Sequence, residues 1–120
     1  MRFQKMNDKM ITMTQTEKRY SKNIGKLFWC GERTYSLNTG QYEYYFNLVM
    51  ISGIQKDKYR KKYQYSVDVI SSPYKDKVSY KLDCSWFKNL LGQINKYGNG
   101  YLPASTGDLE KDVAQIPKAC

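Results

Sequence analysis

The sequence predicts an α+β fold, in which an antiparallel β-sheet of four to six strands is followed by one or two C-terminal helices packed on one face. Apolar and polar residues alternate with a period of two in several segments between residues 24 and 84. After Cys84 the apolar spacing changes to that of an amphipathic helix. A length of 120 residues corresponds to a single domain over 1–120, large enough to bury one core.

Residues 1–23 are expected to form an N-terminal hairpin or arm, with a helix as an equally good alternative. Thr12 and Thr14 alternate with Ile11 and Met13, as they would in a short strand. Because the segment otherwise mixes methionine, threonine and charged residues, the sequence leaves both possibilities open.

The sheet is predicted to occupy residues 24–84. It begins with a strand at about 25–30, a tight turn at Gly31–Glu32 and a second strand that ends at the turn signal Thr39-Gly40. In the next strand all even positions are apolar, namely Tyr42, Tyr44, Phe46, Leu48 and Met50. We therefore expect the even face of this strand to be buried and the odd face, which carries Asn47, to be only partly covered.

The stretch KDKYRKKYQYSVDVI, residues 56–70, begins as a basic loop and continues as an alternating strand. One face of that strand carries Tyr63, Tyr65, Val67 and Val69, and the other carries Lys62, Gln64, Ser66 and Asp68. The loop is expected to join two long antiparallel neighbours, and Pro73 ends the second of them because proline cannot donate to a ladder.

Residues 75–84 repeat the alternation. Val78, Tyr80, Leu82 and Cys84 are expected to point inward, and Lys75, Lys77, Ser79 and Lys81 outward. A helical stripe then follows at Phe87, Leu90, Leu91, Ile94 and Tyr97, which predicts a helix over 85–97 that stops at YGNG. The remaining 98–120 should form a loop and one short helix, capped at Ser105 or Thr106 and ended by Pro117.

Charge and composition restrict the class of function. The formal net charge is +9, from 20 lysine and arginine residues against 11 acidic ones, which favours a polyanionic partner such as RNA or single-stranded DNA. Twelve tyrosines suit half-exposed faces and interfaces better than a deep core. We expect a soluble protein without a membrane partner, because no stretch is apolar enough to span a bilayer.

The absence of histidine excludes serine–histidine and cysteine–histidine nucleophile activation and nearly every mixed zinc site. Three widely spaced cysteines favour a reducing compartment such as the cytoplasm, with Cys30 and Cys84 in the core and Cys120 exposed. No phosphate-binding motif precedes a helix in the required context. The chain is therefore expected to be non-enzymatic and to need no cofactor and no metal.

The candidate site combines basic residues with aromatic ones, because phosphates bind cations and unpaired bases stack on exposed rings. The outward faces of the strands around 60–68 and 75–81 should lie side by side and add their charges on one surface. The predicted nucleic-acid-binding residues are Lys56, Lys58, Tyr59, Arg60, Lys62, Gln64, Ser66, Lys75, Lys77, Lys81, Tyr45 and Asn47.

The layout RTYSLNTGQYEYYFNLVMISGIQKDKYRKKYQYSVDVISSP, residues 33–73, resembles the central hairpin of the coat proteins of small single-stranded RNA phages. In that family two long alternating strands flank a short basic turn. The resemblance implies a homodimer or larger assembly with one continuous sheet, RNA held on the inner face of the sheet, and a capsid shell in the virion. By position, the RNA-facing residues would be Asn47, Arg60, Lys62, Gln64, Ser66 and Asp68.

Two alternatives stay open. The order of strands followed by a helix is similar to that of the PC4, PUR-alpha and Whirly class of single-strand binders, and an OB-fold is also compatible. From another class, the chain would be a small inhibitor or accessory subunit whose basic, tyrosine-rich surface binds an acidic protein partner.

Overall fold

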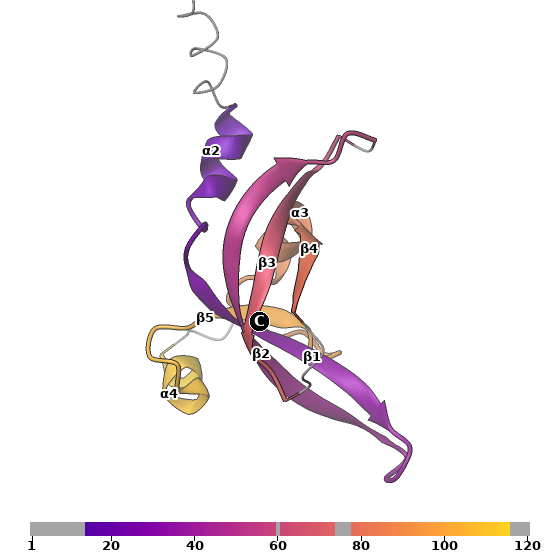
Figure 1. Ribbon diagram of the computed structural model, residues 1–120. Coiled ribbons are helices and arrows are strands. Elements are labelled where there is room, and N and C mark those ends of the chain that lie inside the picture. Colours follow the sequence, from indigo (N-terminus) through magenta and orange to yellow (C-terminus); the bar gives the residue numbers. More distant parts are fainter. Residues whose placement is uncertain (1–13, 60, 74–77, 116–120) are drawn as a thin grey trace, which may run out of the picture.

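The computed structural model describes residues 14–59, 61–73 and 78–115, which form one antiparallel sheet and three short helices (Figure 1). The strands are β1 (Leu27–Ser36), β2 (Gln41–Lys56), β3 (Tyr63–Ser71), β4 (Ser79–Asp83) and β5 (Gly100–Pro103). The helices are α2 (Gln15–Ser21), α3 (Cys84–Leu90) and α4 (Leu109–Ala114). The α+β class predicted from the sequence is confirmed.

The sheet has the strand order β4-β3-β2-β1-β5. Strands β1 to β4 form a meander in which each strand pairs with the next, and β5 returns to the opposite edge beside β1. We call the side of the sheet that carries Phe28, Val49 and Tyr65 the core face, and the other side the outer face. The core cluster consists of Phe28, Cys30, Val49, Ile51, Tyr65, Val67, Leu82, Cys84, Phe87, Leu90 and Tyr101.

The described part of the N-terminal arm is the helix α2. Thr14 is its N-cap, and a capping box with Glu17 satisfies two N–H groups of the first turn. At the other end of α2, the hydroxyl of Tyr65 donates to the carbonyl of Tyr20 at 2.6 Å, which ties the helix to the core face. Residues 1–13 lie outside the described residues.

The first strand differs from the prediction, because β1 runs through Gly31 and Glu32 without a turn. A glycine in a strand interior can mark a close approach by another segment instead of a turn. A Cβ built on Gly31 would lie 2.7 Å from the carbonyl oxygen of Gly98 and 3.0 Å from Cδ1 of Ile94. Glycine is therefore needed at position 31, because a side chain there would collide with the segment that contains Ile94 and Gly98. The predicted turn at Thr39-Gly40 is confirmed.

The prediction for the two faces of β2 is wrong. Val49 and Ile51, at odd positions, are fully buried, whereas Tyr42 and Tyr44, at even positions, are about half exposed. Both faces of this strand are apolar, so the period of two could not decide which one meets α3. The cross-strand partners decide it: Val49 lies opposite both Phe28 and Val69, and these belong to the core face.

The alternation in β3 and β4 is as predicted, since Tyr65, Val67 and Leu82 are buried. The outward sets also lie side by side, because Ser66 pairs directly with Lys81. Val78 is an exception: it was expected to point inward, but it precedes β4 and is 72% exposed. The carbonyl of Val78 accepts from the N–H of Val69 at 3.0 Å, but the side chain lies before the first residue of β4 and does not reach the core.

The predicted helix 85–97 is shorter in the structure, where α3 ends at Leu90 and Leu91 takes an extended conformation. Gly92 follows with φ 85°, a left-handed conformation that stops the helix. Ile94 and Tyr97 therefore lie in the connection to β5, a strand that the sequence did not predict. The last helix, α4, is capped by Asp108, not by Ser105 or Thr106, and Ile116 and Pro117 lie outside the described residues.

Asp112 of α4 is buried and joins the C-terminal segment to β1. Its carboxylate accepts from Nε1 of Trp29 at 2.7 Å and from the hydroxyls of Ser105 and Thr106, both at 2.9 Å. Burial raises the pKa of Asp112, but these hydrogen bonds outweigh that effect and hold the pKa well below its usual range.

The lowered pKa makes the stability contribution of Asp112 pH-dependent. A carboxyl whose pKa is lower in the folded state stabilises the fold above its unfolded value of about 3.9, and this contribution is lost as the pH falls through the folded value. We expect Asp112→Asn to be less stable than the wild type at neutral pH, with a gap that narrows below about pH 4. Urea denaturation of both proteins from neutral to acid pH measures this gap, and a gap independent of pH would contradict the assignment.

Candidate nucleic-acid interface

The outer face of β3 and β4 brings together three of the predicted residues. Gln64, Ser66 and Lys81 lie on this face, and Nζ of Lys81 donates to Oγ of Ser66 at 3.4 Å. Asp68 shares the face and pairs with Met50 and Ser79. Arg60, Lys75 and Lys77 lie outside the described residues. The described part of this surface is thus polar, with Lys81 as its basic residue.

Two predicted residues do not belong to this surface. Asn47 is fully buried on the core face, where its Nδ2 donates to Oε2 of Glu32 at 2.7 Å. Tyr45 is half-buried on the same face and its hydroxyl donates to Oε1 of Glu32 at 3.2 Å. Both were predicted to bind nucleic acid from the partly covered odd face of β2. That face is the core face, so neither residue lies on the outer surface of β3 and β4.

The loop between β2 and β3 is ordered by Asp57. The N–H of Asp57 donates to the carbonyl of Lys62 at 2.7 Å, and the N–H of Lys61 donates to the carbonyl of Asp57 at 2.7 Å. Oδ1 of Asp57 accepts from the N–H of Tyr59 at 2.8 Å. Lys61 adopts φ 57°, a left-handed conformation that lets the chain reverse here. These hydrogen bonds close the base of the turn.

This turn presents an aromatic ring among cations. The side chain of Tyr59 is 87% exposed, the largest exposure of any described aromatic residue. Lys58, Lys61 and Lys62 are exposed around it. Nζ of Lys56 lies 5.5 Å from the ring centroid of Tyr63, so that this lysine stays over the core-face side of β3. We call residues 56–62 the basic loop.

Helix α2 adds cations at the same end of the molecule. The hydroxyls of Thr14 and Tyr63 lie 3.3 Å apart, and the rings of Tyr20 and Tyr63 are 6.2 Å apart, so α2 stands beside the base of the loop (Figure 1). The exposed cations of α2 and its C-cap are Lys18, Arg19 and Lys22. The carboxylates nearby accept from backbone N–H groups, as Glu17 does from Thr14 and Asp83 from Ser85.

A groove of about 240 Å³ lies at the base of the basic loop. Its lining residues come from α2, the start of β3 and the junction of β4 with α3: Thr16, Tyr20, Lys62, Tyr63, Asp83 and Ser85. The groove therefore connects the lysines of the loop with the core-face side of the molecule.

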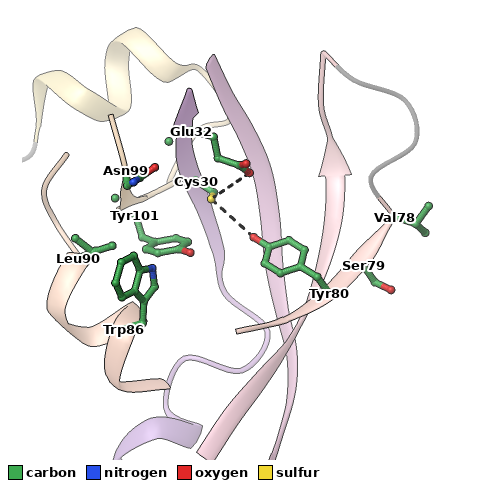
Figure 2. A pocket seen from close by; sticks show the side chains of 11 residues that line it. Cys30, Glu32, Val78, Ser79, Tyr80, Trp86, Leu90, Asn99 and Tyr101 are labelled. Atoms are coloured by element: carbon green, nitrogen blue, oxygen red, sulfur yellow. Dashed lines mark hydrogen bonds between the residues drawn. The ribbon is translucent and has the colours of Figure 1, made fainter. Parts of the chain in front are cut away.

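A larger pocket of about 510 Å³ opens beside α3 (Figure 2). Its aromatic lining consists of Tyr80 from β4, Trp86 from α3 and Tyr101 from β5. Strand β1 contributes Cys30 and Glu32, which form a polar chain: the hydroxyl of Tyr80 donates to Sγ of Cys30, and Sγ donates to Oε2 of Glu32, both at 3.8 Å. The pocket thus has aromatic walls and a polar floor.

The carboxylate of Glu32 is fixed from behind by buried groups. Asn47 lies opposite Cys30 in the ladder and donates to Glu32. Oδ1 of Asn47 is buried and accepts no hydrogen bond from the residues that the structure describes. An unsatisfied buried carbonyl oxygen costs free energy, and the hydrogen bond that the same amide donates to Glu32 offsets part of this cost.

Two tyrosines that line the pocket, Tyr80 and Tyr101, are in their neutral forms. Burial raises the pKa of Tyr80 and that of Tyr101 well above the ordinary tyrosine value, and the neighbouring Cys30 raises both further. Burial also raises the pKa of Cys84 to about 12, with Asp83 adding to the shift. Cys84 is thus a protonated core residue, as predicted, and the tyrosine hydroxyls can serve as hydrogen-bond donors and not as nucleophiles.

The sequence reasoning missed this pocket. Glu32 follows the apolar run 27–30, and Asn47 stands between Phe46 and Leu48. These polar residues beside apolar ones were the available signal, since buried polar groups need a partner. Among the described residues no three acidic or cysteine side chains gather where they could hold a metal ion. None of the described helices has the length and apolar character needed to cross a membrane.

The fold and the two hollows define an α+β protein with a basic loop at one end of an antiparallel meander. In comparisons with known proteins, no family model, no curated protein and no solved structure matches the chain.

Proposed function

We propose that this protein is a non-enzymatic binder of single-stranded nucleic acid, RNA or single-stranded DNA, and that it binds through the basic loop. The observation that carries the proposal is Tyr59, which is almost fully exposed between lysines of the basic loop and whose N–H donates to Asp57. An exposed ring offers an unpaired base a stacking surface, and the cations around it bind phosphates. The buried thiols of Cys30 and Cys84 fit a reducing compartment or a virion interior.

Several features support a single strand over a duplex. The exposed ring of Tyr59 can stack on a base only if that base is unpaired, as it is in a single strand. The groove at the base of the loop, with Tyr20, Tyr63 and Lys62 in its lining, continues the pairing of aromatic rings with cations. The polar outer face with Gln64, Ser66 and Lys81 gives a second surface along which the strand can extend.

Substitution of Tyr59 tests the stacking contact. Tyr59→Ala should weaken binding of a single-stranded oligonucleotide about fivefold to a hundredfold, because stacking of one base contributes about 1–3 kcal/mol. Fluorescence anisotropy with a labelled oligonucleotide measures the affinity. Tyr59→Phe, which keeps the ring, should bind as the wild type does. Because the side chain is almost fully exposed, neither variant should change the melting temperature, and equal affinity of Tyr59→Ala and the wild type would refute the stacking role.

The coat-protein resemblance extends this proposal to a homodimer or larger assembly that packages RNA. The hairpin of β1 and β2 supports self-association, because Tyr35, Leu37, Tyr42 and Tyr44 are exposed on it. Arg33 stacks on the ring of Tyr42 at 4.0 Å, so the hairpin is a preformed aromatic surface. Light scattering on the purified protein, with the ratio of absorbance at 260 and 280 nm, reports assembly and bound nucleic acid together.

The same hairpin favours a second candidate function, binding of an acidic protein partner. Tyrosine and arginine are the residues that dominate protein interfaces, and the hairpin displays both. Salt separates the two candidates. Binding through phosphates weakens steeply with salt, whereas binding through buried tyrosines depends on it far less.

A further inference from the structure

The pocket beside α3 has a composition suited to one class of ligand. Its volume of about 510 Å³ lies within the range of about 300–1,000 Å³ in which small-molecule sites are found. Tyr80, Trp86 and Tyr101 favour a flat aromatic ligand, and Trp86 is half exposed at the rim, where a ring can enter beside it. The polar floor adds a carboxylate, that of Glu32 (Figure 2). A ligand that fits is therefore planar and carries N–H donors along one edge.

We propose that this pocket holds one unpaired nucleobase and that it prefers guanine, an inference that rests on the proposed function. Guanine presents two adjacent donors on its Watson–Crick edge, the N1–H and the N2 amino group, and a carboxylate accepts both. Uracil presents a single N–H between two carbonyl oxygens, which a carboxylate repels. Glu32 is held in place by Asn47 and Tyr45, so little ordering is needed when the base enters.

The pocket lies within reach of a strand bound at the basic loop. Asp83 and Ser85 line the groove at the base of the loop, and the next residue, Trp86, lines the pocket. Along the sheet, Tyr80 pairs with Val67, four residues after Tyr63, which places the pocket about 13 Å from the start of β3. A strand of a few nucleotides can connect the two, and single-strand sites commonly cover about 4–16 nucleotides.

The test compares two oligonucleotides of about 12 nucleotides, one of uridine alone and one with a single central guanosine. We expect the guanosine to tighten binding about tenfold, within the range of a good two-bond base contact. In Glu32→Gln, which keeps the size of the side chain but removes its charge, the two oligonucleotides should bind within about twofold of each other. Glu43→Gln is the matched control, because Glu43 is exposed on the β1–β2 hairpin and carries the same charge.

A second variant keeps the proposal testable if Glu32→Gln fails to fold. Trp86→Leu removes the wall at the rim, where the side chain is half exposed, and should reduce the preference for guanosine without lowering the melting temperature. Competition by guanosine monophosphate separates the two sources of a base: displacement by the free nucleotide at low concentration indicates a nucleotide site, and its absence indicates a base held within a strand.

The outcomes distinguish this inference from the proposed function. Equal binding of both oligonucleotides by the wild type, with the expected weakening in Tyr59→Ala, would overturn the guanine pocket and leave the basic loop as the site. A preference that persists in both Glu32→Gln and Trp86→Leu would also overturn it. If neither oligonucleotide nor the monophosphate binds, both proposals fail.

Discussion

Replacing Tyr65 with alanine is expected to lower the free energy of unfolding by about 3–5 kcal/mol, the usual cost of truncating a buried aromatic side chain. Tyr65 is fully buried near the start of β3, and its ring packs edge-to-face on Phe87 of α3 with 5.3 Å between centroids. The ring also packs on that of Tyr20 in α2, with 6.2 Å between centroids. Removal of this ring leaves a cavity between the sheet and two helices, so the contacts of β3 with both α2 and α3 are weakened together. Urea denaturation followed by circular dichroism measures it.

Tyr65→Phe is the matched control, since it keeps the ring and removes only the hydroxyl. That hydroxyl donates to the carbonyl of Tyr20 at 2.6 Å and accepts from Nδ2 of Asn23 at 3.1 Å. We expect a destabilisation of about 1–3 kcal/mol, the cost of leaving buried polar groups without a partner. Burial raises the pKa of Tyr65 to about 12, so the hydroxyl is protonated and able to donate at neutral pH. A destabilisation below about 1 kcal/mol in Tyr65→Ala would show that the core is placed wrongly.

Changing Lys58, Lys61 and Lys62 together to alanine is expected to weaken binding of a single-stranded oligonucleotide at least tenfold. These three lysines are exposed on the basic loop, and each lysine that neutralises a phosphate contributes through the release of a counterion. The variant should also be less sensitive to salt. The slope of log affinity against log salt should become shallower by about 2, at about 0.7 for each phosphate that is no longer neutralised.

The control is a variant with the same change in charge at other elements. Lys26, Lys96 and Lys111 are exposed before β1, in the connection to β5 and on α4. Their replacement by alanine should leave the affinity within about threefold of the wild type, since charges beyond a Debye length of about 10 Å act weakly. An equal fall in affinity in both triple variants would mean that net charge, and not the loop, accounts for binding.

The buried face of a strand could be predicted from the sequence only where one face is apolar and the other polar. In β3 one face carries Tyr65 and Val67 and the other Gln64 and Ser66, so the inward side was predicted correctly. In β2 both faces are apolar, and the choice between them depends on which cross-strand partners lie under α3. Such partners are set by register, which includes two irregularities between β2 and β3 that no local pattern shows.

For the candidate site, too, the sequence predicted only what neighbouring residues determine. The basic loop was predicted because its lysines and Tyr59 are close together in the sequence, and exposure follows from a turn between two strands. The pocket was not predicted, because its residues are far apart in the chain and meet only when β5 returns beside β1. Cys30 pairs with Tyr101 across this junction, and Gly31 pairs with Gly100. A pattern read along one segment contains no information about that crossing.

The proposed function requires above all that the basic loop binds the phosphates of a single strand. The affinity of the wild-type protein for a labelled oligonucleotide of about 16 nucleotides, followed from about 50 to 200 mM salt, tests it directly. We predict tight binding at the low end and a steep, linear fall of log affinity with log salt. Absence of binding in the most dilute buffer, or an affinity unchanged by salt, would contradict phosphate binding by the basic loop.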